Sequence, residues 1–200
     1  MTMTSDRLPM VMRADWIPGP AQGHWTYEEY AALPDDGNRY EIVNGVLYMS
    51  PSPSGPHQDT AFEIASYLRA HIKLTGLGLV RMAPFDVILS PDEVVQPDVL
   101  VVFNEHSDRV ADKFILGAPD LVVEVASPST AIHDRHHKLD AYARAGVPEY
   151  WIVDPDSRTV EVLALETVGM YQSLGIFRGK ATLPSLIVPD FSPRVEQFFM

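Results

Sequence analysis

The chain has 200 residues, of which 46% are hydrophobic and 21% are charged, and its formal net charge is −12. This length and composition fit one globular domain with a sizeable core. The absence of cysteine excludes disulfides, zinc–thiolate sites and a thiol nucleophile, and the acidic balance argues against general nucleic-acid binding, which depends on neutralising phosphates.

The first residues show no periodic pattern. Residues 1–24 contain several Pro and Gly, which predicts a flexible N-terminal arm before a single domain over residues 25–200. Residues 1–6 have neither the basic nor the apolar region of a signal peptide, and no apolar run approaches the ~20 residues that span a bilayer. We therefore expect a cytoplasmic protein without membrane contact.

A short helix and a hairpin are predicted next. The Thr-x-x-Glu pattern at residues 26–29 is a capping box that opens a helix. The strand-like runs 40–43 and 46–49 flank the dipeptide Asn44-Gly45, which is a strong hairpin signal. Glu41 shares a face of this hairpin with Val43, Val46 and Tyr48, so it either faces solvent or joins a site, and the pattern alone favours solvent.

A longer helix follows a loop rich in Pro and Ser. It begins at His57 and runs to about Leu74, with a core face made of Ala61, Ile64, Ala65, Leu68 and Ile72. A histidine in a first turn is structural more often than catalytic, so the position alone does not assign His57 a role. Residues 79–81 and 85–89 are typical of strands.

Two further strands each carry one acidic residue. Pro97 fits only a strand's start or edge, so a strand is expected to begin near Asp98 and to run to residue 103. Residues 121–125 are apolar on both faces around Glu124, which indicates a central strand with helices on either side. We expect the strands 98–103 and 120–126 to lie side by side, and residues 104–119 to form a polar connection with a short helical turn.

Glu124 requires compensation for its charge. Burying an unpaired charge costs on the order of 3 to 5 kcal/mol, so a metal ion or a basic side chain is expected beside it. The alternative is a structural glutamate in a salt bridge at the open end of the strand.

The next helix, over residues 131–145, supplies a candidate cation. Ser129 or Thr130 can cap it, Leu139, Tyr142 and Ala143 form its buried stripe, and Gly146 ends it. Lys138 stands at the rim of that stripe, from which its long stem can reach Glu124. An i,i+4 pair with Asp134 is equally favoured by spacing.

Three histidines on the same helix form an i, i+3, i+4 cluster that suits a transition metal: His133, His136 and His137. Histidines on a solvated helix face are more often incidental, so we leave them out of the site.

The C-terminal part is predicted to be rich in strands. Residues 149–154 and 159–165 form two of them, residues 171–177 complete a last hairpin, and residues 191–199 pack down as a tail. Together with the Pro-rich arm, the aromatic side chains exceed what one small core readily covers: Tyr150, Trp151, Phe191, Phe198 and Phe199. This excess predicts a homodimer.

Two acidic residues on neighbouring strands with a lysine close by are typical of a metal-dependent nuclease. Mg²⁺ binds one or two carboxylates and keeps waters and phosphate oxygens as its other ligands. The ion lowers the pKa of a bound water and stabilises charge on the phosphoryl group, and an ammonium orients that water.

Four segments in one order carry a resemblance that reaches from about Thr26 to the C-terminus. They are Tyr-Glu-Ile-Val-Asn-Gly at 40–45, Val-Gln-Pro-Asp-Val at 95–99, the run 121–130, and the run 138–155. The sequence resembles the Uma-two family of putative restriction endonucleases in the PD-(D/E)XK nuclease superfamily. The resemblance implies an α/β (α+β) restriction-endonuclease-like fold, a mixed sheet flanked by helices, with N-terminal and C-terminal β-hairpins.

The resemblance also implies a set of site residues. Asp98 and Glu124 match metal ligands, with the carbonyl of Val125 as a third, for Mg²⁺ with Mn²⁺ as a possible substitute. Glu41 matches the family's N-terminal acidic position, and His57 matches its histidine after the Pro-rich loop.

The chain departs from the superfamily motif at one position, because Ala126 stands where the motif has a lysine. The resemblance implies that Lys138 supplies the missing ammonium.

Two functions follow as hypotheses. The first is a Mg²⁺-dependent DNA endonuclease that hydrolyses phosphodiester bonds, and the retention of Glu41, Asp98, Glu124 and Lys138 favours it. The alternative is a catalytically inactive module on the nuclease fold that acts through protein or nucleic-acid binding, which the acidic balance favours.

Overall fold

A central sheet forms the middle of the protein. The computed structural model describes residues 11–126, 137–167 and 169–199. The strand order of this sheet is β12 (Met170–Arg178), β11 (Thr159–Thr167), β10 (Glu149–Asp154), β9 (Leu121–Val125), β7 (Val99–Phe103) and β4 (Gly78–Met82).

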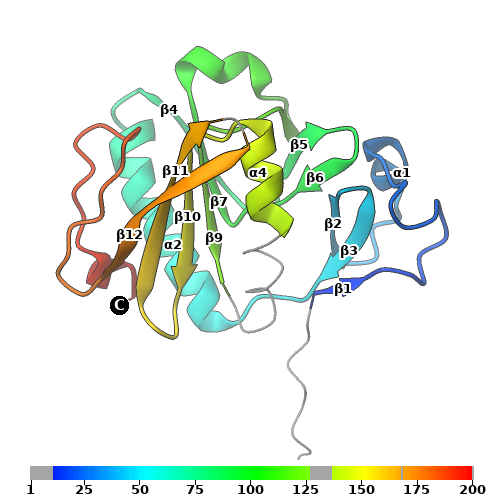
Figure 1. Ribbon diagram of the computed structural model, residues 1–200, viewed down its shortest axis with the longest axis horizontal. Coiled ribbons are helices and arrows are strands. Elements are labelled where there is room, and N and C mark those ends of the chain that lie inside the picture. The colour runs from blue at the N-terminus through cyan, green and yellow to red at the C-terminus, as the bar shows by residue number, and fades with distance from the viewer. Residues whose placement is uncertain (1–10, 127–136, 168, 200) are drawn as a thin grey trace, which may run out of the picture.

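A second sheet, the hairpin sheet, lies beside the first (Figure 1). Its strand order is β1 (Met12–Arg13), β3 (Val46–Ser50), β2 (Arg39–Val43), β6 (Glu93–Val95), β5 (Asp86–Ser90) and β8 (Phe114–Leu116). The turn between β2 and β3 has φ of 52° at Asn44 and 68° at Gly45, which is the left-handed geometry that an Asn-Gly dipeptide favours. The predicted N-terminal hairpin is therefore confirmed.

The two strands that carry acidic residues are neighbours, as predicted. β9 lies between β10, with which it is parallel, and β7, with which it is antiparallel. Val99 pairs with Val123, so Asp98 at the start of β7 stands next to the C-terminal end of β9. The register of the sheet thus brings Asp98 and Glu124 to the same end.

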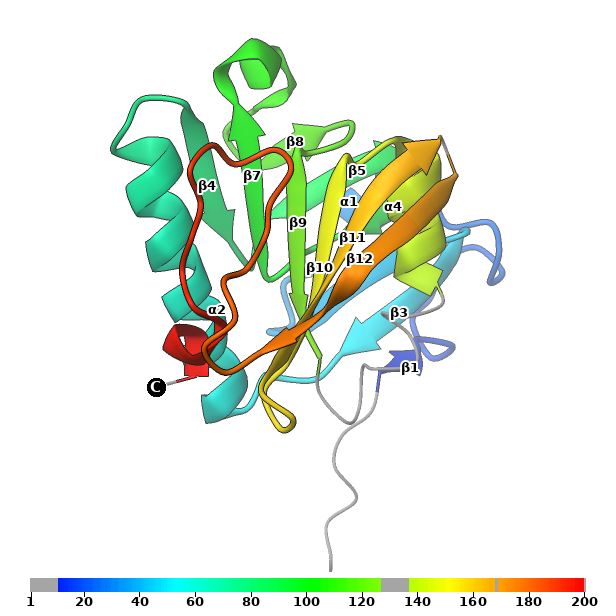
Figure 2. The ribbon, with the colours of Figure 1, turned by 60° about the vertical axis from the view of Figure 1, so that its left-hand side comes forward.

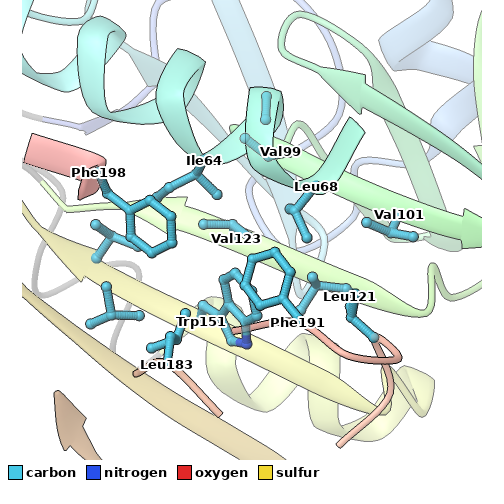
Figure 3. Close-up of a cluster of buried hydrophobic side chains, with 14 of the residues drawn as sticks. Ile64, Leu68, Val99, Val101, Leu121, Val123, Trp151, Leu183, Phe191 and Phe198 are labelled. Atoms are coloured by element: carbon cyan, nitrogen blue, oxygen red, sulfur yellow. The ribbon is translucent and has the colours of Figure 1, made fainter. Parts of the chain in front are cut away.

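Helices cover both faces of the central sheet (Figures 1 and 2). The helix α2 (Gly55–Leu68), continued by the π-helical turn η1 (Arg69–Lys73), packs on one face, with Ile64 and Leu68 against Val99 and Val123 (Figure 3). The helix α4 (Leu139–Ala145) packs on the other, against residues that alternate with these in β7 and β9. Residues 139–145 confirm the end of the predicted helix, whereas the proposed caps Ser129 and Thr130 and the partner Asp134 lie outside the described residues.

The N-terminal arm requires a correction from Val11 onward. Residues 12–13 form β1 and pair with β3, Ala14 is fully buried, and the backbone N–H of Gly23 donates to the carbonyl of Gly45 at 2.8 Å. This segment leads to the short helix α1 (Tyr27–Ala31), whose capping box forms as predicted, with the Thr26 N–H donating to Glu29 Oε2 at 3.0 Å. The lack of periodicity reflects an irregular path over the hairpin sheet rather than a loose chain.

The C-terminal tail is part of the core. Phe191 packs on Trp151 with ring centroids 5.4 Å apart, and Phe198, in the 3₁₀ turn η4 (Val195–Phe199), is buried in the same cluster next to Ile64 of α2 (Figure 3). Tyr150 is buried on the opposite face of the sheet. One chain therefore buries most of the aromatic side chains from which a homodimer was predicted. The homodimer stays a prediction, but these side chains no longer support it.

The connection 104–119 holds more structure than expected. It contains the 3₁₀ turn η2 (Asn104–Arg109), as predicted, and also β8, which pairs in parallel with β5. Three residues give too short a pattern to predict a strand that depends on a distant partner. No helix among the described residues is long and apolar enough to cross a membrane.

Candidate active site

Three carboxylates from three parts of the chain converge where the two sheets meet. Glu41 lies on β2, Asp98 directly precedes β7, and Glu124 lies on β9. Their residues are 1%, 6% and 3% exposed. The backbone N–H of Val125 donates to Asp98 Oδ2 at 2.8 Å, which fixes Asp98 against the end of β9. The structure thus brings together the acidic residues that the family resemblance implied. The expectation of a solvent-facing Glu41 is wrong, because Lys138, Arg39 and the backbone N–H of Gln96 surround its carboxylate.

Lys138 lies between two of these carboxylates. Its Nζ is 2.8 Å from Glu41 Oε1 and 3.0 Å from Glu124 Oε1, and its side chain is 3% exposed. The expected position at a rim is therefore wrong, because the ammonium is inside the cluster. The predicted reach from Lys138 to Glu124 is correct. One helical turn later, the hydroxyl of Tyr142 donates to Glu124 Oε1 at 2.6 Å.

Arg39 is a further cation of the cluster, and the sequence analysis missed it. Its Nη1 lies 3.7 Å from Asp98 Oδ1 and its Nη2 lies 3.8 Å from Glu41 Oε1. The guanidinium also donates to the backbone carbonyl of Gln96, whose own N–H donates to Glu41 Oε1 at 2.6 Å. The available signal was the i,i+2 spacing of Arg39 and Glu41, which places both side chains on one face of β2.

These cations keep the carboxylates charged. Burial by itself would raise the pKa of Glu41, but the charges of Lys138 and Arg39 outweigh it, so the pKa of Glu41 lies below its usual value. Burial acts in the same direction on Asp98, and the hydrogen bond and charge of His57, together with Arg39, hold its pKa below the usual value. The pKa of Tyr142 is raised well above 10.0 by burial and by the charge of Glu124, so its hydroxyl remains a donor.

His57 is also part of the site. It lies in the first turn of α2, and its Nε2 is 3.2 Å from Asp98 Oδ2. Its Nδ1 is buried and has no hydrogen-bond partner within the described part of the chain. The histidine that the resemblance implied therefore contacts a carboxylate of the cluster.

A pocket of about 990 Å³ opens beside the cluster. Arg39, His57, Gln96 and Asp98 line it, together with residues from the end of β3, the first turns of α2 and the connection between β4 and β5. We call it the α2 pocket. It gives a ligand direct access to Asp98.

Two carboxylates of the cluster are suitable ligands for a metal ion. Asp98 and Glu124 offer carboxylate oxygens, which are the hard ligands that Mg²⁺ prefers, so their donor chemistry fits. Within residues 11–126, 137–167 and 169–199, no group of three or more His, Asp or Glu side chains has the spacing of a ready metal site. The carboxylates instead contact Lys138, Arg39 and His57, and an ion would have to compete with these contacts.

The histidine cluster of the sequence analysis falls largely outside the described residues. His133 and His136 are not described, and His137 is exposed, with its ring centroid 6.4 Å from that of Tyr48.

Comparisons with known proteins agree with this fold. The chain superposes on the crystal structure of a putative nuclease of the DUF820 family from Anabaena variabilis with a TM-score of 0.73 and 21% sequence identity, over 87% of this chain and 97% of that chain. The predicted class, a mixed sheet flanked by helices as in restriction endonucleases, is thereby confirmed.

The sequence itself shows to which family the chain belongs. Residues 27–196 match the Uma2 (Uma-two) family, described as putative restriction endonucleases, so the chain belongs to that family. A search of curated proteins gave no match.

Proposed function

We propose that the protein is a Mg²⁺-dependent DNA endonuclease that hydrolyses phosphodiester bonds, with Mn²⁺ as a substitute ion. The observation that carries the proposal is the convergence of the buried carboxylates of Glu41 and Glu124 on Lys138, with the buried Asp98 next to them at the wall of the α2 pocket. Charged groups concentrated beside a cleft, with pKa values moved by their neighbours, are characteristic of catalytic sites. Membership of a family described as putative restriction endonucleases supports the same reaction.

Asp98 and Glu124 would hold the ion, with the carbonyl oxygen of Val125 as a third ligand. A bound Mg²⁺ supplies a lowered pKa for a bound water and neutralises charge on the phosphoryl group. His57 and the Val125 N–H keep Asp98 ionised and fixed, and Tyr142 orients Glu124 through the 2.6 Å hydrogen bond.

Lys138 and Arg39 supply positive charge at the site. In the proposed reaction the ammonium of Lys138, which contacts Glu41 and Glu124, donates to the attacking water and orients it. Arg39 lines the α2 pocket, so its guanidinium can bind a phosphate oxygen of a DNA strand there. Glu41 holds both cations and sets their positions.

A second function is favoured by one observation. Each of the three carboxylates already contacts a basic side chain, which is also what a structural salt-bridge network requires. The cluster could then stabilise a catalytically inactive module that acts through protein or nucleic-acid binding, in line with the net charge of −12. Metal binding separates the two functions, because a purely structural network has no need of an ion.

The test measures both cleavage and metal binding. Labelled DNA is incubated with the protein in Mg²⁺, in Mn²⁺ and in EDTA, and Mg²⁺ binding is measured by calorimetry. We expect cleavage in either metal and none in EDTA. Asp98→Asn keeps the side-chain size but removes the charge, so Mg²⁺ affinity should fall by at least about tenfold and cleavage should be lost with it.

Asp112→Asn is the matched control, because Asp112 is exposed. It should bind Mg²⁺ and cleave DNA as the wild type does. A wild-type protein that binds no Mg²⁺ and cleaves no DNA would support the inactive module instead.

A further inference from the structure

The α2 pocket has an apolar wall at the surface of the protein. Phe62 on α2 and Met82 at the end of β4 line it and are 60% and 38% exposed. Met49, Ala83 and Pro84 extend the same wall. An exposed phenyl ring beside a cleft offers a flat face on which a planar ligand can stack. The pocket volume of about 990 Å³ lies at the upper end of the range for small-molecule sites, roughly 300–1,000 Å³.

Three residues that line the pocket each carry a buried polar atom without a partner. The described residues contain five buried side-chain nitrogen or oxygen atoms that make no hydrogen bond, and three of them belong to residues that line this pocket: Arg39 Nε, His57 Nδ1 and Gln96 Oε1. An unpaired buried polar atom costs about 1 to 3 kcal/mol, which a ligand that pairs with it recovers. Gln96 is 92% buried, given its exposed fraction of 8%, and its Nε2 is already bound to Asp86 and Tyr30, so its Oε1 remains available as an acceptor.

The charge of the pocket does not suit an intact duplex. Arg39 and His57 are its basic side chains, and Asp35, Asp59 and Asp98 also line it. Duplex binding depends on several Lys or Arg side chains that neutralise successive phosphates. A pocket with one arginine can bind one phosphate, and its remaining surface suits a base.

We propose that the α2 pocket takes one unpaired nucleotide of the DNA substrate. Its base stacks on Phe62, an amino group on its edge donates to Gln96 Oε1, and its phosphate lies against Arg39 beside Asp98. Aromatic stacking is the usual way in which proteins hold unpaired bases, whereas paired bases are covered by their neighbours. The substrate is therefore DNA with an unpaired strand rather than intact duplex, an inference that rests on the proposed nuclease function and narrows its substrate.

The experiment measures binding apart from cleavage. The full-length protein is titrated, in EDTA and at one fixed salt concentration, into a fluorescently labelled single-stranded oligonucleotide and into the duplex of the same sequence, and anisotropy is recorded. The single strand should bind more tightly. Phe62→Ala should weaken single-strand binding by about 5- to 150-fold, the range expected for losing one stacked base, and should leave duplex binding unchanged.

Leu116→Ala is the matched control. Leu116 is also 60% exposed and lies on β8, outside the pocket lining, so its loss should change neither affinity. Phe62→Trp keeps an aromatic face and should retain single-strand binding. Thermal unfolding checks that all three variants fold as the wild type does.

Three binding results would each overturn the inference: equal affinity for duplex and single strand, single-strand binding unaffected by Phe62→Ala, or tighter binding of the matching RNA strand. These outcomes are distinguishable from failure of the nuclease function. Cleavage of duplex DNA without preference for unpaired strands would overturn the inference alone. A Phe62-dependent preference for the single strand without cleavage in Mg²⁺ would overturn the nuclease and leave the nucleotide pocket standing.

Discussion

Glu41 and Glu149 are equally buried, with exposed fractions of 1% and 0%, yet the protein treats their charges in opposite ways. Glu41 contacts the ammonium of Lys138 and the guanidinium of Arg39. Glu149 accepts hydrogen bonds from neutral donors, at 2.7 Å from Trp151 Nε1, 2.8 Å from the Ser185 hydroxyl and 2.7 Å from the Leu186 N–H. Burial therefore raises the pKa of Glu149, whereas the cations lower the pKa of Glu41.

Glu149 and the candidate site lie at opposite ends of the neighbouring strands β9 and β10. Glu149 pairs with Leu121 at the start of β9, and its carboxylate fastens the segment that begins at Ser185 to the sheet. Glu124 lies toward the other end of β9, opposite Asp98, which lines the α2 pocket, and it contacts Lys138. Burial of a carboxylate does not by itself mark a site. The candidate site combines buried carboxylates with shared cations and a neighbouring pocket, and this combination is characteristic of catalytic sites.

The largest effect should follow from removing the central cation. Lys138→Met keeps the length of the side chain but leaves Glu41 and Glu124 buried with one cation fewer. Breaking a buried ion pair in this way costs about 3 to 5 kcal/mol. Urea unfolding at neutral pH should therefore show a loss of that size, together with a loss of cleavage.

A second substitution, added to Lys138→Met, tests the cause of this loss of stability. Adding Glu41→Gln removes one of the two stranded charges, so the double variant should recover part of the lost stability without recovering activity. A Lys138→Met protein as stable as the wild type would show that solvent reaches the cluster, and the contrast with Glu149 would then have no basis.

Local patterns predicted the frame of the site well. The Asn-Gly turn, the apolar runs of β7 and β9, and the core face of α2 depend on neighbouring residues, and each appears where its pattern lies. Asp98 and Glu124 could be selected because each interrupts or opens a buried strand. Because successive side chains of a strand point to opposite faces of the sheet, the sequence of β9 also predicts which of its apolar residues share a face.

The contacts inside the site could not be predicted from such patterns. Arg39 reaches Asp98 across 59 positions of sequence, and Lys138 reaches Glu41 across 97. The local pattern left Glu41 either facing solvent or joining a site and favoured solvent, because nothing local shows that Lys138 lies against that face of the hairpin. Only the family resemblance placed Glu41 in the site. The same limitation affected the tail, whose aromatic residues are covered by α2 and the sheet within one chain.

A smaller effect is expected from Glu149→Gln, which tests the other half of the contrast through pH. The folded-state pKa of Glu149 is raised above its usual value of 4.5, so the folded protein binds more protons than the unfolded chain above that pH, and stability falls as the pH rises toward the folded pKa. A displacement of one pKa unit corresponds to about 1.4 kcal/mol. Urea unfolding measured at a series of pH values above 4.5 should show a flatter pH dependence in the variant than in the wild type.

The site carboxylates give the opposite sign. Glu41 and Asp98 have folded pKa values below their usual 4.5 and 3.8, so the stability they contribute is present above those values and is lost as the pH falls through the folded ones. Glu149→Gln should leave this loss of stability at acid pH unchanged. If Glu149→Gln changed the pH dependence of stability at acid pH and not near neutral pH, the assignment of a raised pKa to Glu149 and of lowered pKa values to Glu41 and Asp98 would be reversed.

The smallest effect is expected at Arg144, whose Nη2 lies 2.6 Å from Glu93 Oε1. Glu93 is nearly as buried as Asp98, but the Arg144 side chain is 50% exposed, and burial holds the pKa of Glu93 above its usual value in spite of this partner. Because water screens an exposed guanidinium, Arg144→Met should cost no more than about 1 kcal/mol in urea unfolding, and salt should reduce that cost further. A loss as large as that of Lys138→Met would mean that any cation on a buried carboxylate matters equally. A small loss would show instead that the stability held by Lys138 arises from its enclosure between two carboxylates.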